Sequence, residues 1–200
     1  MIIFVIYIKM KKSVIFLDLD GVMCLLNDWG TRTKKMLKFK KEFPGSSEDD
    51  MPAWIKLDNF DYKATKVLNS ILLHYDVEIV ISSDWKLFAT LEQLQEMFDK
   101  YGVIKSPIDT TPNFLKYQSK FGFSKEDLEQ NRISEIKDWL KNHPEVTHWV
   151  AVDDLDLGEK FGPISGNSNG GLTNFVHTPK STQGIKQTGV KEKIIKYLND

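Results

Sequence analysis

The sequence predicts an α/β fold in which helices cover a central, mostly parallel β-sheet. Three observations support this prediction. Short apolar runs alternate along the chain with longer amphipathic segments, which is the order of strands and helices around a parallel sheet. Carboxylate or hydroxyl side chains directly follow several of these runs. The chain has 200 residues, of which 41% are hydrophobic, so it can bury one sizeable core. We therefore expect a single domain over residues 1–200.

The apolar runs place the expected strands, and the segments between them place the helices. The strands are predicted, in chain order, at Val14 to Leu17, Val77 to Ser82, Val103 to Ile104, Trp149 to Val152 and Phe175 to His177. Helices are predicted where apolar residues recur at three- and four-residue spacing. These segments are Tyr62 to His74, Thr90 to Tyr101, Ser134 to Asn142 and Val190 to Leu198.

Two stretches do not fit this alternation. Residues 27–58 are charged and then rich in turn residues, and we interpret them as an inserted flap or small cap. Residues 158–173 are rich in Gly, Asn and Ser and have no apolar period, so we expect a loop there.

Charge and hydrophobicity exclude several function classes. The 27 Lys and Arg residues nearly balance the 28 Asp and Glu residues, so the chain as a whole does not attract nucleic acid or an anionic membrane. The apolar run at residues 1–8 is shorter than the ~20 residues that span a bilayer, and its lysines follow it rather than precede it. Residues 1–9 are either an upstream extension or an added edge strand. The single cysteine fits a reducing compartment. We expect a cytoplasmic protein with no membrane partner.

Two pairs of carboxylates follow predicted strands. Asp18 and Asp20 come after the first strand, and Asp153 and Asp154 come after "WVAV". Because ligands of an open parallel sheet bind outside the carboxyl ends of its strands, both pairs are expected at one edge. Grouped carboxylates are stabilised by a cation, and oxygen ligands with room for water suit Mg²⁺. We therefore predict a Mg²⁺ site, with helix caps or turn formers as the structural alternative.

Hydroxyls and an arginine complete the candidate site. Ser82 and Ser83 follow the apolar run "IVI", and Arg132 precedes the predicted helix that leads to the Asp153 strand. A hydroxyl at a strand end can hold a phosphate oxygen, and an arginine can neutralise phosphate or carboxylate charge. Each feature has an ordinary structural explanation as well, since such serines often cap turns and such arginines are often solvated.

In this order the motifs resemble those of the haloacid dehalogenase-like (HAD) phosphatase superfamily. More narrowly, "FLDLDGV", "ISSDWK", "RISEIKDWL" and "VDDLDL" resemble the HAD domain of Swiss-army-knife RNA repair proteins, with Lys86 where that group commonly has Arg. The resemblance extends from about Val14 to the C-terminus. It implies a HAD-like Rossmannoid three-layer sandwich with a small flap or cap.

The resemblance also implies a reaction and a role for each residue. The chain is expected to be a Mg²⁺-dependent phosphomonoester hydrolase that forms an aspartyl-phosphate on Asp18, with Asp20 as general acid and base. Mg²⁺ would be held by Asp18, by the backbone carbonyl of Asp20 and by Asp154, with Asp153 as an alternative ligand. The phosphoryl oxygens would be held by Arg132 and by Ser82, or by Ser83 if the motif slips by one residue.

The substrate is less closely defined by the sequence. A short insertion at 27–58 leaves an open site that admits a large substrate such as a nucleic-acid end. Arg32, Lys34, Lys35 and Lys38 lie there with aromatic residues interleaved, a mixture that can contact phosphates and bases. The alternative for these charges is a solvated helix face.

Two other functions stay open at this point. One is a phosphatase for small metabolites such as nucleotides or sugar phosphates, against which the lack of a large cap argues. The other is a non-catalytic, receiver-like regulatory domain. Asp20 argues against the second, because a carboxylate beside the nucleophile promotes hydrolysis.

Overall fold

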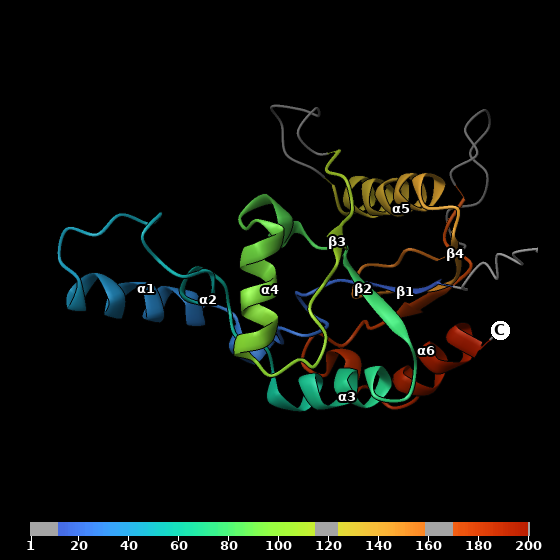
Figure 1. Cartoon of the computed structure of the whole chain (residues 1–200), viewed down its shortest axis with the longest axis horizontal. Coiled ribbons are helices and arrows are strands. Elements are labelled where there is room, and N and C mark those ends of the chain that lie inside the picture. The colour runs from blue at the N-terminus through green and yellow to red at the C-terminus, as the bar shows by residue number, and fades with distance from the viewer. Residues whose placement is uncertain (1–11, 115–123, 159–169, 200) are drawn as a thin grey trace, which may run out of the picture.

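A computed structural model of the chain describes residues 12–114, 124–158 and 170–199 (Figure 1). The strands are β1 (Lys12–Leu17), β2 (Val77–Ile81), β3 (Asp109–Thr110), β4 (Val146–Asp153) and β5 (Phe175–His177). The helices are α1 (Thr31–Glu42), α2 (Ala53–Lys56), α3 (Tyr62–Leu72), α4 (Leu91–Lys100), α5 (Lys125–Asn142) and α6 (Val190–Asn199). The predictions for residues 1–9 and for most of the 158–173 loop lie outside the described residues. No helix in the described ranges is both long and apolar enough to cross a membrane.

The strands of the described chain form one parallel sheet in the order β3-β2-β1-β4-β5. The chain runs outward from β1 through β2 to β3 and then returns to build β4 and β5 on the other side of β1. The direction of winding therefore reverses between β1 and β4. Ligands of open α/β sheets bind at such a reversal, outside the carboxyl ends of the strands. The predicted α/β architecture with a parallel sheet is confirmed.

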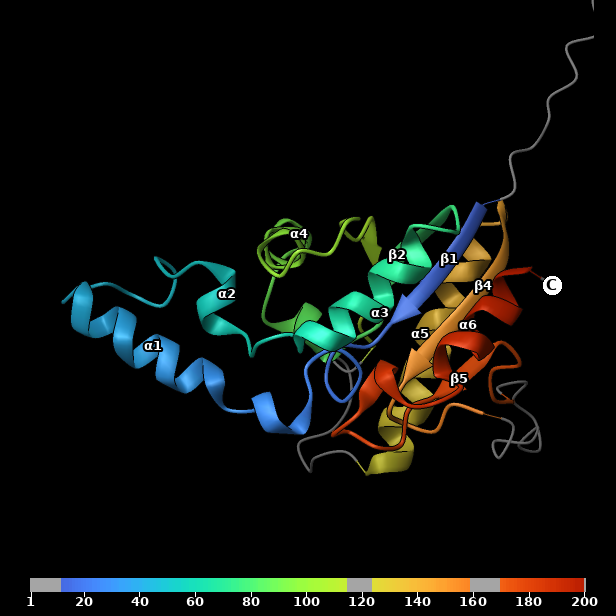
Figure 2. The same cartoon turned by 90° about the horizontal axis from the view of Figure 1, so that it is seen from below.

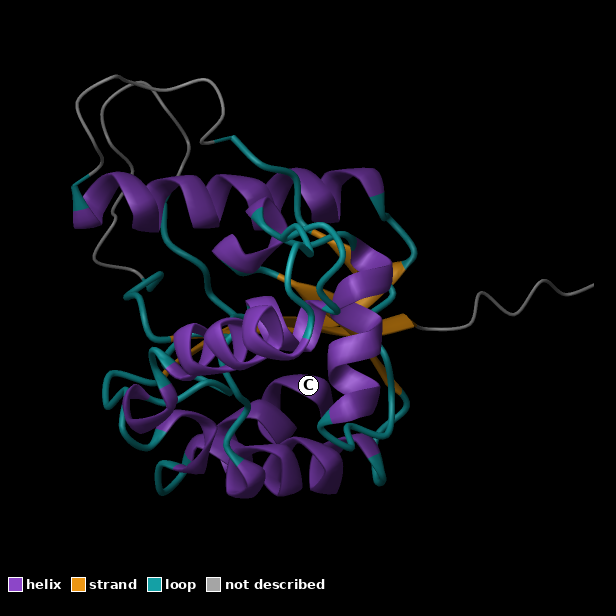
Figure 3. Cartoon of the chain, turned by 90° about the vertical axis from the view of Figure 1, so that its left-hand side faces the viewer, coloured by secondary structure: helices purple, strands orange, loops and turns teal. Residues whose placement is uncertain are grey.

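Helices cover both faces of the sheet, which gives three layers (Figures 1 and 3). Side chains alternate along β1. Val14 and Phe16 pack in one cluster with Ile133, Ile136 and Trp139 of α5. Ile15 and Leu17 pack in the other cluster, with apolar residues of α3, α4 and α6. A strand buried on both faces needs a continuous apolar run rather than an alternating one, and this explains the sequence "VIFL".

Residues 27–58, which we predicted to be an inserted flap or small cap, contain α1 and α2, and these helices extend away from the sheet (Figures 1 and 2). No residue of α1 is buried. Its first turn is fixed by the buried carboxylate of Asp58, whose Oδ1 accepts hydrogen bonds from Thr31 Oγ1 at 3.1 Å and from the backbone N–H of Arg32 at 2.7 Å. Asp58 therefore joins the C-terminal end of the 27–58 segment to the first turn of α1.

Lys35 corrects one part of the predicted basic surface. Its Nζ donates to the backbone oxygens of Trp54 and Leu57 and to Asn59 Oδ1, the last at 2.8 Å. These three bonds use the donor capacity of an ammonium group. Lys35 therefore ties α1 to the following segment, and it is not available to a nucleic-acid phosphate.

Two secondary-structure predictions are wrong. The strand expected at Val103 to Ile104 is absent from the described residues there, and the edge strand is β3, which pairs with Val80 and Ile81. The helix expected from Ser134 begins at Lys125, where Ser124 and Asp127 form a reciprocal capping box. Arg132 therefore lies inside α5 rather than before a helix.

Candidate active site

Three polar residues lie in one row at the carboxyl ends of the central strands. The backbone N–H of Asp18 donates to Val152 O at 3.0 Å, and that of Ser82 donates to Leu17 O at 2.9 Å. The pairing of Leu17 with both Ile81 and Val152 continues by one residue to Ser82, Asp18 and Asp153. Because side chains alternate, this row lies on the face that α5 covers.

Arg132 of α5 joins this row. Its Nη1 donates to Asp18 Oδ1 at 3.0 Å, to Asp153 Oδ2 at 2.8 Å and to the backbone oxygen of Ser82, while Nη2 donates to Asp84 Oδ1 at 3.0 Å. The side chains of Arg132, Asp18 and Asp153 are all at most 6% exposed. Asp84, which sequence reasoning missed, has a half-exposed side chain. The buried guanidinium of Arg132 thus binds residues at the carboxyl ends of β1, β2 and β4, and also Asp84 in the turn after β2.

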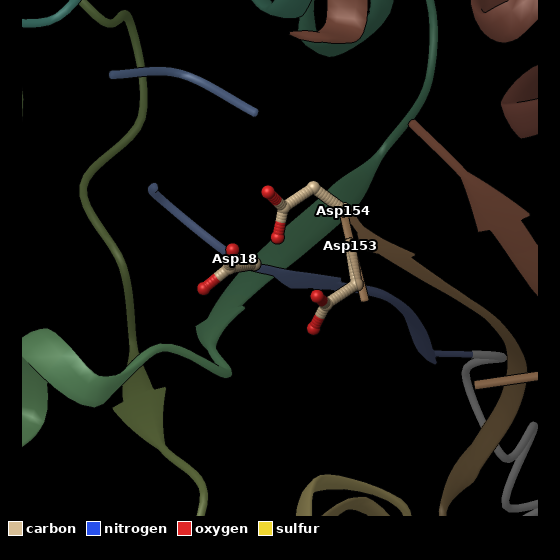
Figure 4. A group of neighbouring side chains, drawn as sticks. All are labelled: Asp18, Asp153 and Asp154. Carbon is tan, nitrogen blue, oxygen red and sulfur yellow. The ribbon is translucent and has the colours of Figure 1, made fainter. Parts of the chain in front are cut away.

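The acidic residues outnumber this cation. Asp18, Asp153 and Asp154 each offer one carboxylate oxygen, and these three oxygens lie within 4.8 Å of one another (Figure 4). Burial and the neighbouring carboxylates raise the pKa of Asp18, and burial raises the pKa of Asp153 to about 6 even though Arg132 opposes the shift. Burial would lower the pKa of Arg132, but these carboxylates raise it and keep the guanidinium charged. Hard oxygen donors with excess negative charge fit a divalent cation such as Mg²⁺.

Asp20 lies in a different environment. Its Oδ2 accepts a hydrogen bond of 2.9 Å from Trp85 Nε1. Burial raises the pKa of Asp20, and the Trp85 bond partly opposes that shift. The indole of Trp85 is buried and stacks on Phe60, so its N–H is held in place. Sequence reasoning did not identify this contact between Trp85 and a site carboxylate.

Ser82 and Ser83 are both 1% exposed, and their hydroxyl oxygens have no hydrogen-bond partner in the described part of the chain. A buried hydroxyl without a partner is costly, so a bound group that hydrogen-bonds there would remove this cost. The register favours Ser82 over Ser83 for a role beside Asp18, because only Ser82 shares its row.

Lys86 is the second buried cation in this region. It forms an ion pair with Glu135, and both side chains are at most 5% exposed. Lys86 Nζ also donates to Thr111 Oγ1 at 2.8 Å. Lys86 therefore joins the Asp84 turn to α5 and to the loop after β3, which supports Arg132 one turn away on the same helix.

The acidic cluster predicts a link between pH, Mg²⁺ and stability. A carboxyl whose pKa is raised by folding stabilises the fold below its unfolded pKa, and this contribution is lost as pH rises through the folded value. In EDTA, the free energy of unfolding is therefore expected to fall by about 1–3 kcal/mol between pH 4 and 7 because of Asp153. Mg²⁺ should restore more stability at pH 7.5 than at pH 5. Urea unfolding with and without Mg²⁺ measures both, and Asp153→Asn should flatten the profile. An unchanged profile in that variant would contradict the assignment.

Gly21 predicts a geometric test of Asp154. Gly21 has a φ of +69°, and a Cβ added there would lie 2.2 Å from Asp154 Oδ2. Gly21→Ala should therefore displace this carboxylate and weaken Mg²⁺ affinity by about tenfold, the cost expected when support of a metal ligand is disturbed. Isothermal titration calorimetry measures the affinity. Gly102→Ala is the matched control, since Gly102 has a φ of +73° and open space around its Cβ position. Equal Mg²⁺ affinity in both variants would argue against Asp154 as a ligand.

Comparison with known proteins agrees with this geometry. Residues 14–188 match the family model described as the HAD domain in Swiss Army Knife RNA repair proteins. That range contains all but the first two residues of β1, the whole of α5, the ends of β2 and β4, and every site residue described above. Neither a curated protein nor a solved structure matches the chain significantly. The family match covers most of the chain, and the chain belongs to the family of HAD domains found in Swiss Army Knife RNA repair proteins.

Proposed function

We propose that the chain is a Mg²⁺-dependent phosphomonoester hydrolase that works through an aspartyl-phosphate on Asp18. Its family supports a phosphatase of the HAD type. The observation that carries the proposal is the row of Ser82, Asp18 and Asp153 with Arg132 hydrogen-bonded along it. The row brings together a carboxylate that would serve as nucleophile, a cation that would bind phosphate, and a buried hydroxyl without a partner among the described residues, all at the reversal point of the sheet.

The roles of the two N-terminal carboxylates follow from their surroundings. Asp18 attacks phosphorus, and the bond from phosphorus to the leaving oxygen breaks as the bond to the carboxylate forms. Asp20 gives its proton to that leaving oxygen, a role that a raised pKa favours. Asp20 then takes a proton from the water that cleaves the aspartyl-phosphate. The Trp85 N–H holds the other end of the Asp20 carboxyl during both steps.

Arg132 and Ser82 would hold the non-bridging oxygens of the transferred group, where negative charge must be stabilised. Asp18, Asp154, the backbone carbonyl of Asp20 and Asp153 are the residues that would hold Mg²⁺. When bound, the cation would offset the charge of the carboxylates and of the phosphoryl group.

For the substrate we propose a nucleic-acid end. The description of the family as part of RNA repair proteins favours this class. Arg32, Lys34 and Lys38 are exposed on α1, and α1 extends from the site side of the sheet (Figure 2). Their positive charges can attract the backbone phosphates of a nucleic acid.

The test is phosphate release from a small aryl phosphate, followed by oligonucleotides phosphorylated at the 5′ or 3′ end. We expect turnover with Mg²⁺, none in EDTA, and at least about a tenfold loss in Asp154→Asn. Higher kcat/KM for the oligonucleotides than for sugar phosphates supports the substrate class, and the reverse points to a small-metabolite phosphatase. A long-lived aspartyl-phosphate without release of phosphate would instead identify a receiver-like regulatory domain.

A further inference from the structure

A cavity of about 350 Å³ is lined in part by Asp20, the residue that would protonate the leaving group in the proposed reaction. Asp20, Trp85, Trp29, Arg32 and Asp58 are among its lining residues. Its volume falls within the ~300–1,000 Å³ of pockets that hold small ligands. The cavity therefore lies between the turn that carries Asp20 and the first turn of α1, and it is large enough for a small organic group.

Trp29 gives this cavity an aromatic wall. Its side chain is 45% exposed, yet its Nε1 donates to Cys24 O at 3.3 Å, which fixes the ring on the loop after β1. Trp85 is nearly buried and is held by Asp20 and Phe60. An exposed but fixed indole offers a flat surface on which a planar ring can stack at low entropic cost.

Arg32 also lines this cavity. Asp58 fixes its backbone, while its guanidinium makes no hydrogen bond or ion pair with residues 12–114, 124–158 or 170–199. Arg32 also lines a second cavity of about 370 Å³ that includes Lys56 and the exposed ring of Phe88. Arg32 is therefore a lining residue of both cavities. Glu48 and Asp49 line the second cavity as well, so further phosphates beyond it would be repelled.

Resting on the proposed function, we propose that these cavities bind the first two units of a phosphorylated oligonucleotide. The terminal nucleoside occupies the cavity beside Asp20, with its base on Trp29. The phosphodiester that links it to the next unit pairs with Arg32, because a guanidinium binds phosphate in a bidentate manner. The second nucleoside lies against Phe88. Arg32 thus determines specificity for an oligomer over a single nucleotide, and Trp29 determines specificity for a nucleotide over a phosphate that carries no base.

The experiment compares kcat/KM for a terminally phosphorylated mononucleotide, dinucleotide and trinucleotide of the same base. Each is tested once with the phosphate at the 5′ end and once with the phosphate at the 3′ end. The dinucleotide is expected to exceed the mononucleotide by about tenfold, the size of one charge-assisted hydrogen bond, with little further gain for the trinucleotide. Arg32→Met should bring the ratio of the two kcat/KM values to about one, because it raises KM for the dinucleotide. Trp29→Leu should lower the preference for the mononucleotide over ribose 5-phosphate.

Lys41→Met is the control, since Lys41 is an exposed cation of the same helix that lines neither cavity. It removes the same charge and should keep the dinucleotide ratio. A ratio that falls equally in Lys41→Met and Arg32→Met would mean that general charge attracts the substrate, and a ratio near one in the unmodified chain would overturn the inference. Turnover of the aryl phosphate separates these failures from failure of the proposed function, because that substrate has no second unit.

Discussion

Asp18→Asn is expected to lower kcat for phosphate release by at least about 10³-fold, because the amide cannot form the bond to phosphorus that the carboxylate forms. The same variant is expected to fold. Burial and neighbouring charge raise the pKa of Asp18, so at neutral pH without metal its negative charge destabilises the native state. Replacing it with a neutral side chain of the same shape should therefore keep or increase the free energy of unfolding in EDTA. Steady-state kinetics and urea unfolding of the two proteins measure both effects.

A large loss of kcat together with unchanged or increased stability in Asp18→Asn would distinguish a nucleophile from a structural residue. A structural role for Asp18 in orienting Arg132 predicts lower stability and a smaller loss of activity, since Arg132 keeps its bond to Asp153. Phosphate release within tenfold of the unmodified chain would show that Asp18 is not the nucleophile. Asp109→Asn is a matched control, because Asp109 is a carboxylate at another strand of the sheet whose Oδ2 accepts from Trp139 at 2.6 Å, away from the cluster.

The central fold was predictable because its strands are buried on both faces. Val14 to Leu17 and Val77 to Ile81 form apolar runs that contain no charge except Glu78, and such runs indicate internal parallel strands. The edge strand escaped prediction for the opposite reason. Asp109 and Thr110 are polar and form a strand of two residues, so only pairing with β2 defines it. The first turns of α5 are polar too, and their clearest signal was the Ser124 to Asp127 capping box.

The site was predictable to the extent that its residues end strands. Asp18, Asp153 and Ser82 follow apolar runs, and the switch in winding brings them together. Contacts that depend on the conformations of individual side chains could not be predicted from the sequence. Trp85 donates to Asp20 and Lys35 binds three oxygens of its own insertion, yet each has the sequence features of an ordinary packing or surface residue. Asp84 likewise acquires its role only because α5 carries Arg132 over the sheet edge.

Arg132→Met is expected to destabilise the fold by about 3–5 kcal/mol at pH 7.5 in EDTA, the range found when one partner of a buried ion pair is removed. The loss has a specific cause. Asp18 and Asp153 would keep their negative charges in a buried site without the guanidinium that now touches both, and Ser82 O would lose a donor. Phosphate release should fall with it, because the phosphoryl oxygens would lose their cation. Chemical unfolding and kinetics at matched pH values measure the two losses.

The pH dependence distinguishes charge compensation by Arg132 from packing. Without the guanidinium, the pKa values of Asp18 and Asp153 rise further, so their contribution to stability persists at low pH and is lost as pH increases. The destabilisation should therefore be much smaller at pH 5 than at pH 7.5. Arg132→Lys, which retains the charge, should recover part of the stability at pH 7.5 but less of the activity, since an ammonium group lacks the planar fork whose second nitrogen, Nη2, also binds Asp84. Adding Asp153→Asn to Arg132→Met should also restore stability, because it removes one uncompensated charge. A loss of the same size at both pH values, with no rescue by Asp153→Asn, would show that the Arg132 side chain acts mainly through its packing against α5 and the sheet.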